Sequence, residues 1–162
     1  MNFKNKVIVI TGASSGIGEA SAIKFAKKNA KIVLVARRKE KLLQLQKKLV
    51  KFTDSTLVCQ CDVSNKTQVK EMTDIVLDTF GRIDVLINNA GFVIYGKVSE
   101  LSIEEIESQM ETNYFGMIYC TKNFLPHMIE QGRGHIVNVA SVGASFGAVS
   151  YTHLTLPTIY SV

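Results

Sequence analysis

Long apolar runs are missing from this 162-residue sequence, and none approaches the roughly 20 residues that a membrane-spanning helix needs. The N-terminal stretch MNFKNKVIVITG leads straight into a strand-like run and has no apolar core or cleavage site of a signal peptide. Only two prolines occur, and no segment has the composition of a disordered linker. The sequence therefore predicts a folded cytoplasmic protein without a membrane partner.

Cysteine is also scarce, and the three thiols are Cys59, Cys61 and Cys120. No cluster of His and Cys has the spacing of metal ligands, so no metal site is predicted. Reduced thiols fit the cytoplasmic interpretation.

Positive charge is concentrated in the first third of the chain. Residues 1–52 hold 13 Lys and Arg against 2 Asp and Glu, whereas residues 53–162 hold 6 against 12. A basic segment can bind nucleic acid, but no reader motif or interleaved aromatic residues accompany it here. We interpret the lysines as the solvated faces of amphipathic helices and predict no nucleic-acid partner.

Short β-branched runs alternate with helical stretches along the chain. Strands are predicted at 7–11, 31–36, 55–60, 85–88 and 135–140, and helices at 16–30, around 42–52, around 69–80 and from Ser102 towards Met128. Nearly continuous apolar strands indicate a parallel sheet that is covered on both faces. The predicted fold class is α/β, a doubly wound (Rossmann) parallel sheet truncated after the fifth strand.

The stretch TGASSGIG, residues 11–18, lies between the first predicted strand and helix. Gly12 permits a tight turn, Gly16 lets the backbone approach a pyrophosphate, and Gly18 lets helix and strand pack closely. The loop residues Ser14, Ser15 and Ile17 surround the free N–H groups at the start of the helix. Because these groups and the helix dipole attract anions, the loop predicts a dinucleotide site.

The end of the second strand, VARRKEK, indicates which dinucleotide is bound. An acid at this place holds the ribose 2′-OH in sites for NAD, but here Ala36 occupies the place and Arg37 and Arg38 follow. A guanidinium can bind a 2′-phosphate that a carboxylate would repel. The sequence thus favours NADP(H) over NAD(H). The alternative is that the two arginines only cap a basic helix.

Four motifs together resemble the short-chain dehydrogenase/reductase family: TGxxxGxG at 11–18, NNAG at 88–91, NYFG at 113–116 and IVNVAS at 136–141. The resemblance covers residues 1 to about 148. It implies strand order 3-2-1-4-5, transfer of hydride between NADP(H) and a small-molecule carbonyl/alcohol substrate, and a homo-oligomeric parent protein.

The resemblance also implies roles for single residues. Asp62 and Val63 would contact the adenine, although Asp62 could at the same time be a turn residue at a helix start. The nucleoside side of the site would be lined by Asn89, Ala90 and Gly91.

Asn113 and Ser141 are the two catalytic residues that the resemblance implies. On a helix of about 3.6 residues per turn, Asn113 falls on an apolar stripe. The stripe comprises Ile106, Met110, Asn113, Met117, Phe124 and Met128. The resemblance implies that Asn113 binds a water of the proton relay and marks a local distortion of the helix. The alternative is that Asn113 is a polar core residue whose amide is hydrogen-bonded to backbone groups. Ser141 would hydrogen-bond the substrate carbonyl.

The Tyr-x-x-x-Lys pair of the family is missing from the sequence. Thr155 stands four residues after Tyr151, and no lysine follows Lys122. Residues 149–162 resemble a translated sequencing adapter and are expected to be a non-native tail behind an NADP-binding domain of residues 1–148. The chain as printed is therefore predicted to be catalytically inactive. The alternative function is a non-catalytic NADP(H)-binding module.

Overall fold

The computed structural model describes residues 2–97 and 99–141. Tyr151 and the predicted tail at 149–162 lie outside these residues. The strands are β1 Val7–Thr11, β2 Lys31–Ala36, β3 Thr56–Gln60, β4 Val85–Asn88 and β5 His135–Asn138. The α-helices are α1 Gly16–Ala26, α2 Lys39–Leu49, α3 Lys66–Phe80, α4 Ile103–Met110 and α5 Gly116–Glu130, and the π-helix η1 Glu111–Phe115 joins the last two.

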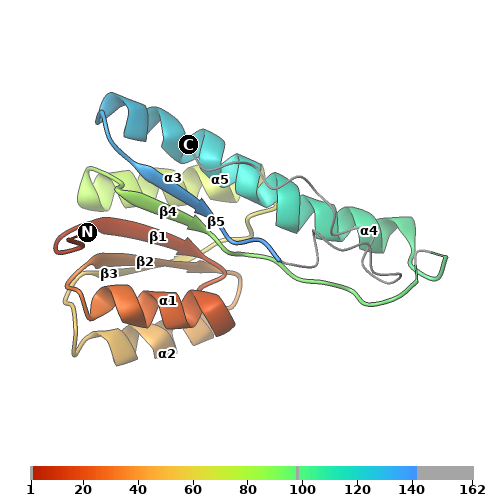
Figure 1. Cartoon of the computed structure of the whole chain (residues 1–162), viewed down its shortest axis with the longest axis horizontal. Coiled ribbons are helices and arrows are strands. Elements are labelled where there is room, and N and C mark those ends of the chain that lie inside the picture. The colour runs from red at the N-terminus through yellow and green to blue at the C-terminus, as the bar shows by residue number, and fades with distance from the viewer. Residues whose placement is uncertain (1, 98, 142–162) are drawn as a thin grey trace.

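The five strands form one parallel sheet in the order β3-β2-β1-β4-β5, as predicted (Figure 1). β1 lies at its centre, where Ile8 is paired with Ile32 of β2 and Val85 of β4. From β1 the chain adds β2 and then β3 on one side of β1, and it then crosses the sheet to add β4 on the other side of β1. This reversal leaves the turns after β1 and β4 side by side at the carboxyl end of the sheet.

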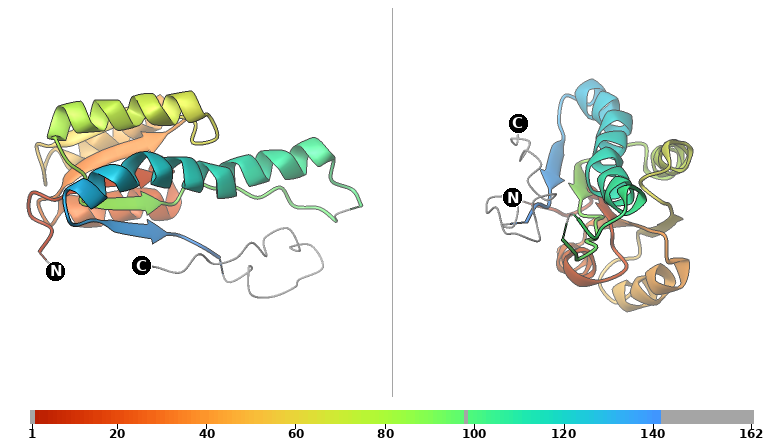
Figure 2. Two further views of the ribbon diagram at one scale, coloured as in Figure 1. Left: turned by 90° about the horizontal axis from the view of Figure 1, so that it is seen from above. Right: turned by 90° about the vertical axis from the view of Figure 1, so that its right-hand side faces the viewer.

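Helices cover both faces of the sheet, which explains why β1 is apolar at successive positions (Figures 1 and 2). Val7 and Val9 face a core that is completed by α3 and α5. Ile8 and Ile10 face a second core that is completed by α1 and α2. Every apolar residue of β1 is fully buried.

The long helix predicted from Ser102 is interrupted by η1, so the predicted apolar stripe is only partly correct. A π turn contains one more residue than an α turn and therefore rotates the residues after it about the helix axis. Phe124 and Met128 are buried as predicted, but Met110 and Met117 are half-buried. The buried positions of this helical stretch are Gln109, Gly116, Cys120, Phe124 and Met128. Asn113 lies inside η1, which is the local distortion that the resemblance implied.

Two other elements are shorter than predicted. α1 ends at Ala26 rather than residue 30, because Asn29 has a left-handed backbone (φ 56°) that a helix does not contain. β5 ends at Asn138, and its Val137 is 42% exposed, so this outer strand is much less covered than β1.

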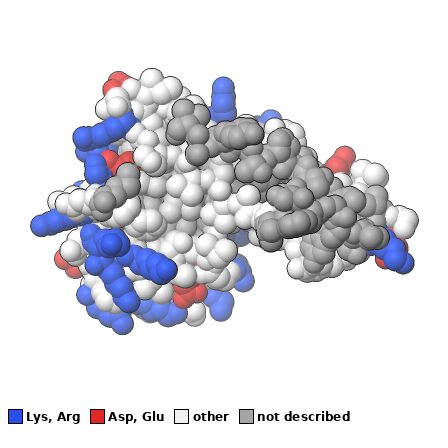
Figure 3. Space-filling view, in the orientation of Figure 1, with Lys and Arg blue, Asp and Glu red and all other residues white. Residues whose placement is uncertain are grey.

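Lysines and arginines gather over the part of the surface where α1 and α2 lie (Figures 1 and 3). The exposed lysines there include Lys27, Lys28, Lys47, Lys48 and Lys51. Lys47 and Lys48 lie on the solvent side of α2, whose other side is buried, as the charge pattern predicted, whereas Lys27, Lys28 and Lys51 lie in the turns that follow α1 and α2. Within residues 2–97 and 99–141, no helix is both long enough and apolar enough to cross a bilayer.

Asp84 joins the amino ends of β1, β4 and β5 and is only 7% exposed. Its carboxylate accepts hydrogen bonds from Lys6 Nζ (3.1 Å), from the Val7 N–H (3.0 Å) and from Arg82. Its own backbone bonds Val7 O and the His135 N–H at 2.9 Å each. Burial raises the pKa of the Asp84 carboxyl, but these hydrogen bonds outweigh burial and hold the pKa below the ordinary value of 3.8.

We expect Asp84→Asn to lower the free energy of unfolding at pH 7 by about 3 kcal/mol, because it removes the partner of two cations and a buried N–H. A depressed pKa stabilises the fold above the unfolded value near 3.8, and this contribution disappears as pH falls through the lower folded value. The difference between wild type and variant should therefore shrink below about pH 4. Urea unfolding at pH 7 and pH 3 measures it. Asp78→Asn, at an exposed position of α3, is the control, and equal losses in both variants would contradict the assignment.

Candidate functional site

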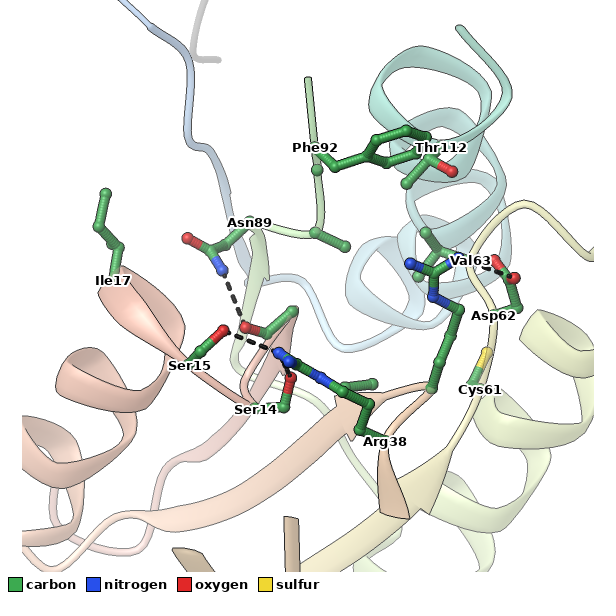
Figure 4. Close-up of a pocket in the computed structure, with 15 residues that line it drawn as sticks. Ser14, Ser15, Ile17, Arg38, Cys61, Asp62, Val63, Asn89, Phe92 and Thr112 are labelled. Carbon is green, nitrogen blue, oxygen red and sulfur yellow. Dashed lines mark hydrogen bonds and ion pairs between the residues drawn. The ribbon is translucent and has the colours of Figure 1, made fainter. Parts of the chain in front are cut away.

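A cavity of about 490 Å³ opens at the carboxyl ends of the strands. Its wall comes from the turn after β1, the end of β2, the turn between β3 and α3, the segment after β4, and η1 (Figure 4). The lining residues are Gly12, Ser14, Ser15, Ile17, Ala36, Arg37, Arg38, Cys61, Asp62, Val63, Asn89, Ala90, Gly91, Phe92 and Thr112. The fold thus gathers five separate segments around one space.

Nearly all residues predicted to bind the coenzyme lie in this wall. Gly16 and Gly18 are not part of the lining but belong to the same turn and helix start. Cys61 and Thr112 line the cavity without having been predicted. Thr112 directly precedes Asn113 in η1. Its position next to the NYFG motif was the only feature of the sequence that could have indicated its role.

The three glycines of the turn have different surroundings. Gly12 has φ +65°, and a Cβ there would lie 2.8 Å from Ala90 Cα. A Cβ on Gly18 would lie 2.4 Å from Gly12 O, so α1 packs against the turn more tightly than any side chain permits. Gly16 has φ +56° and no atom within 4 Å of its Cβ position. Two glycines are thus required by protein packing, whereas the third faces open space, as a ligand-approach position should.

Thr11 and Asn89 join the turn after β1 to the segment after β4. Thr11 Oγ1 accepts from the N–H groups of Asn89 (2.9 Å) and Ala90 (3.0 Å) and donates to Ile87 O (3.3 Å). The Asn89 side-chain amide donates to Thr11 O at 2.9 Å and to Gly12 O at 3.4 Å (Figure 4). Asn89 thus binds the turn after β1 through its side-chain amide and also lines the cavity.

Arg38 reaches across the cavity mouth to the glycine turn. Its Nη2 donates to Ser14 Oγ at 2.8 Å and to Ser15 Oγ at 2.9 Å (Figure 4). Ser15 is the N-cap residue of α1, but its side chain makes no capping hydrogen bond to that helix. The first-turn N–H groups of α1 consequently have no side-chain cap and can meet an anion.

Arg37 points towards Asp62, whose Oδ2 lies 3.8 Å from its Nη1. Asp62 also accepts from the Ser64 N–H (3.1 Å) and from Ser64 Oγ (2.7 Å), just ahead of the α3 N-cap Asn65. It is thus a turn residue at a helix start, and it lines the cavity at the same time. Both guanidinium groups stand at the end of β2, where no carboxylate follows the strand.

The two predicted catalytic residues lie outside the cavity lining. The Asn113 amide is paired with the Phe92 backbone: Oδ1 accepts from the N–H at 3.0 Å and Nδ2 donates to the carbonyl at 2.8 Å. This is the backbone-satisfied amide of the alternative interpretation, and a water relay stays a prediction. Ser141 is exposed and follows β5 at the end of the described chain.

Cys61 lines the cavity as a free, buried thiol. Burial, followed by the charge of Asp62, raises the pKa of its thiol to about 12, so it stays protonated at neutral pH. All three cysteines are free and buried. In the part of the chain that the structure describes, no three His, Cys, Asp or Glu residues are grouped as metal ligands.

Comparison with known proteins gives the geometry a context. Residues 6–153 match the family model of the short chain dehydrogenases. An uncharacterized oxidoreductase of Staphylococcus aureus strain USA300 is 41% identical over 138 residues, which is 85% of this chain and 59% of the relative. The chain therefore spans about three fifths of that relative's length.

Solved structures agree with the fold. A short-chain dehydrogenase from Streptomyces avermitilis has a TM-score of 0.87 and 32% identity, over 96% of this chain and 56% of that one. Serine dehydrogenase from Escherichia coli has a TM-score of 0.85 and 31% identity, over 91% of this chain and 68% of that one.

We expect Gly18→Ala to cost about 3 kcal/mol or more of unfolding free energy, because its Cβ meets a backbone oxygen that cannot move aside. Alanine would otherwise be favoured at a helical position. Gly16→Ala should cost only about 1–2 kcal/mol, because its strain is confined to the backbone angle. Gly81→Ala is the matched control for Gly16, with φ +67° and open space. Urea unfolding ranks the three variants, and similar losses in all would contradict this packing.

Proposed function

The chain belongs to the short chain dehydrogenase family, and on that premise we propose that it is the coenzyme-binding part of an NADP(H)-dependent oxidoreductase. Its substrate would be a small-molecule carbonyl/alcohol pair. The observation that carries the proposal is the cavity wall: an uncapped helix start stands opposite two guanidinium groups, with Ala36 where a carboxylate would hold a ribose.

The residues present fit a dinucleotide phosphate. Gly16 leaves open space at the start of α1, and the N–H groups of that helix start suit a pyrophosphate. Arg38 donates hydrogen bonds to the hydroxyl groups of Ser14 and Ser15. A bound phosphate could replace these two neutral acceptors. A charged acceptor forms the stronger hydrogen bond with a guanidinium, which favours that exchange. Arg37 is balanced by Asp62 and is the less available of the two.

When bound, the coenzyme supplies or accepts the hydride, and the protein provides binding and orientation. We propose that Ser141 hydrogen-bonds the substrate carbonyl and stabilises charge that develops on its oxygen. Asn113 would hold the segment after β4 and contribute to a water relay. The general acid/base tyrosine and its lysine are not in the sequence, so we propose that the chain as printed binds coenzyme without turning over substrate.

Self-association through the long helical stretch is part of the same proposal. Apolar side chains remain exposed along it, and an apolar helix face in contact with water favours burial against a second copy. These residues are Ile103 (64% exposed), Phe115 (38%), Leu125 (37%) and Ile129 (69%). This surface and the family support the proposal of a homo-oligomeric parent protein.

Titration calorimetry with NADPH and NADH tests the coenzyme assignment. We expect NADPH to bind more tightly, and Arg38→Ala to weaken NADPH by about 10- to 100-fold, as for a lost charge-assisted hydrogen bond. NADH affinity should change little in this variant. Arg133→Ala, at an exposed position before β5, is the control. Binding of neither coenzyme would refute the proposal, and equal affinities would refute the NADP(H) preference alone.

We also expect the chain as printed to leave NADPH unoxidised with a panel of aldehydes and ketones, because no tyrosine is paired with a lysine to transfer the proton. Coenzyme absorbance over time measures this, and turnover above a protein-free control would contradict it. A version that carries the Tyr-x-x-x-Lys pair separates the alternatives. Its turnover supports the enzyme, whereas binding without turnover supports a non-catalytic module.

A further inference from the structure

The segment that follows β4 leaves the sheet and runs beside α4 and η1 (Figures 1 and 2). Phe92, at its beginning, lines the coenzyme cavity. The segment from Phe92 to Tyr95 belongs to no strand. Its backbone N–H and C=O groups therefore need partners other than a sheet ladder.

Two side-chain amides of the helical stretch supply these partners. Gln109 Oε1 accepts from the Ile94 N–H at 2.9 Å, and Gln109 Nε2 donates to Glu105 O at 3.4 Å. Asn113 takes both backbone groups of Phe92, as described above. We call Gln109 and Asn113 the amide pair.

The spacing of the amide pair matches the segment that it binds. Residues four apart on a helix lie one above the other, about 5–6 Å apart. Alternate residues of an extended chain, here Phe92 and Ile94, are about 6.5 Å apart. The two amides thus bind the backbone groups of Phe92 and Ile94 that a neighbouring strand would bind in a sheet. Gly91 allows the close approach, because a Cβ there would lie 3.1 Å from Asn113 Oδ1.

Gln109 is the deeper member of the amide pair, at 3% exposure. A buried amide without hydrogen-bond partners is destabilising, so the two hydrogen bonds of Gln109 favour a single orientation of its side chain. The capping box of Ser102 and Glu105 in turn fixes the helix start that carries it, with hydrogen bonds of 2.9 and 3.1 Å. The helix is therefore a rigid support for the segment.

We propose that Gln109 is a positioning residue of the coenzyme site. It holds Ile94, and together with Asn113 it keeps the segment extended, so that Phe92 forms the cavity wall. Gln109 does not line the cavity and acts through the backbone alone. The effect of Gln109 on coenzyme binding rests on the proposed function, whereas its ordering of the segment does not depend on that function.

The test is Gln109→Met in the full chain, which keeps the length of the side chain and removes both hydrogen bonds. Amide hydrogen exchange at Ile94 and Phe92 should accelerate by on the order of tenfold, while exchange in β1 stays unchanged. NADPH affinity should fall by up to about tenfold, the effect expected for one lost hydrogen bond.

Gln131→Met is a matched control. The Gln131 amide also binds backbone groups: it accepts from the Ile83 N–H at 3.1 Å and donates to the carbonyls of Ile83 (2.8 Å) and Arg133 (3.3 Å). It lies at the opposite end of the sheet from the cavity. We expect this variant to lower stability without changing NADPH affinity or exchange at Ile94.

Equal NADPH affinities of Gln109→Met and wild type would overturn the positioning role while the proposed function stands. Failure of the wild type to bind NADPH would instead refute the proposed function, and the exchange data would still decide on the segment. If Gln109→Met does not fold, the wild type suffices: slow exchange at Phe92 and Ile94 without coenzyme is expected. Exchange there at the rate of an unstructured peptide would overturn the inference.

Discussion

The contact between the turn after β1 and the segment after β4 is the constraint on which the rest of the site depends. Gly12 approaches Ala90 so closely that a Cβ would lie 2.8 Å from its Cα, and Thr11 Oγ1 accepts from two N–H groups of the neighbouring segment. This contact exists because the chain reverses its direction across the sheet at β1. The cavity opens where the two segments separate again.

The two arginines at the cavity have different surroundings from the exposed lysines of residues 1–52. Lys27, Lys28 and Lys51 are exposed near the amino ends of β2 and β3, and the ammonium groups of Lys27 and Lys51 lie over the apolar ring of Phe52. Arg37 and Arg38 stand at the carboxyl end of β2, and each already contacts a polar group of another segment.

Amides organise the opposite wall. Asn89, Asn113 and Gln109 all bind backbone groups, and together they hold the segment after β4 on both of its sides. Neutral side chains suit this role, because they satisfy donors and acceptors without the cost of burying a charge. The π-helix at Glu111–Phe115 places Asn113 towards Phe92 and Thr112 towards the cavity.

The sequence by itself determined the doubly wound sheet and the glycine turn, because apolar periodicity and glycine spacing are local properties of the chain. The strand order and the cavity residues that follow β3 and β4 were implied by the resemblance of four motifs to the short-chain dehydrogenase/reductase family. Only the tertiary structure decided which side chains are buried after the π turn, the positions of Cys61 and Thr112, and the partners of Asp84 and Gln109. A buried polar side chain such as Gln109 carries no periodic signal, since its role depends on a backbone group 15 residues away that folding alone brings near.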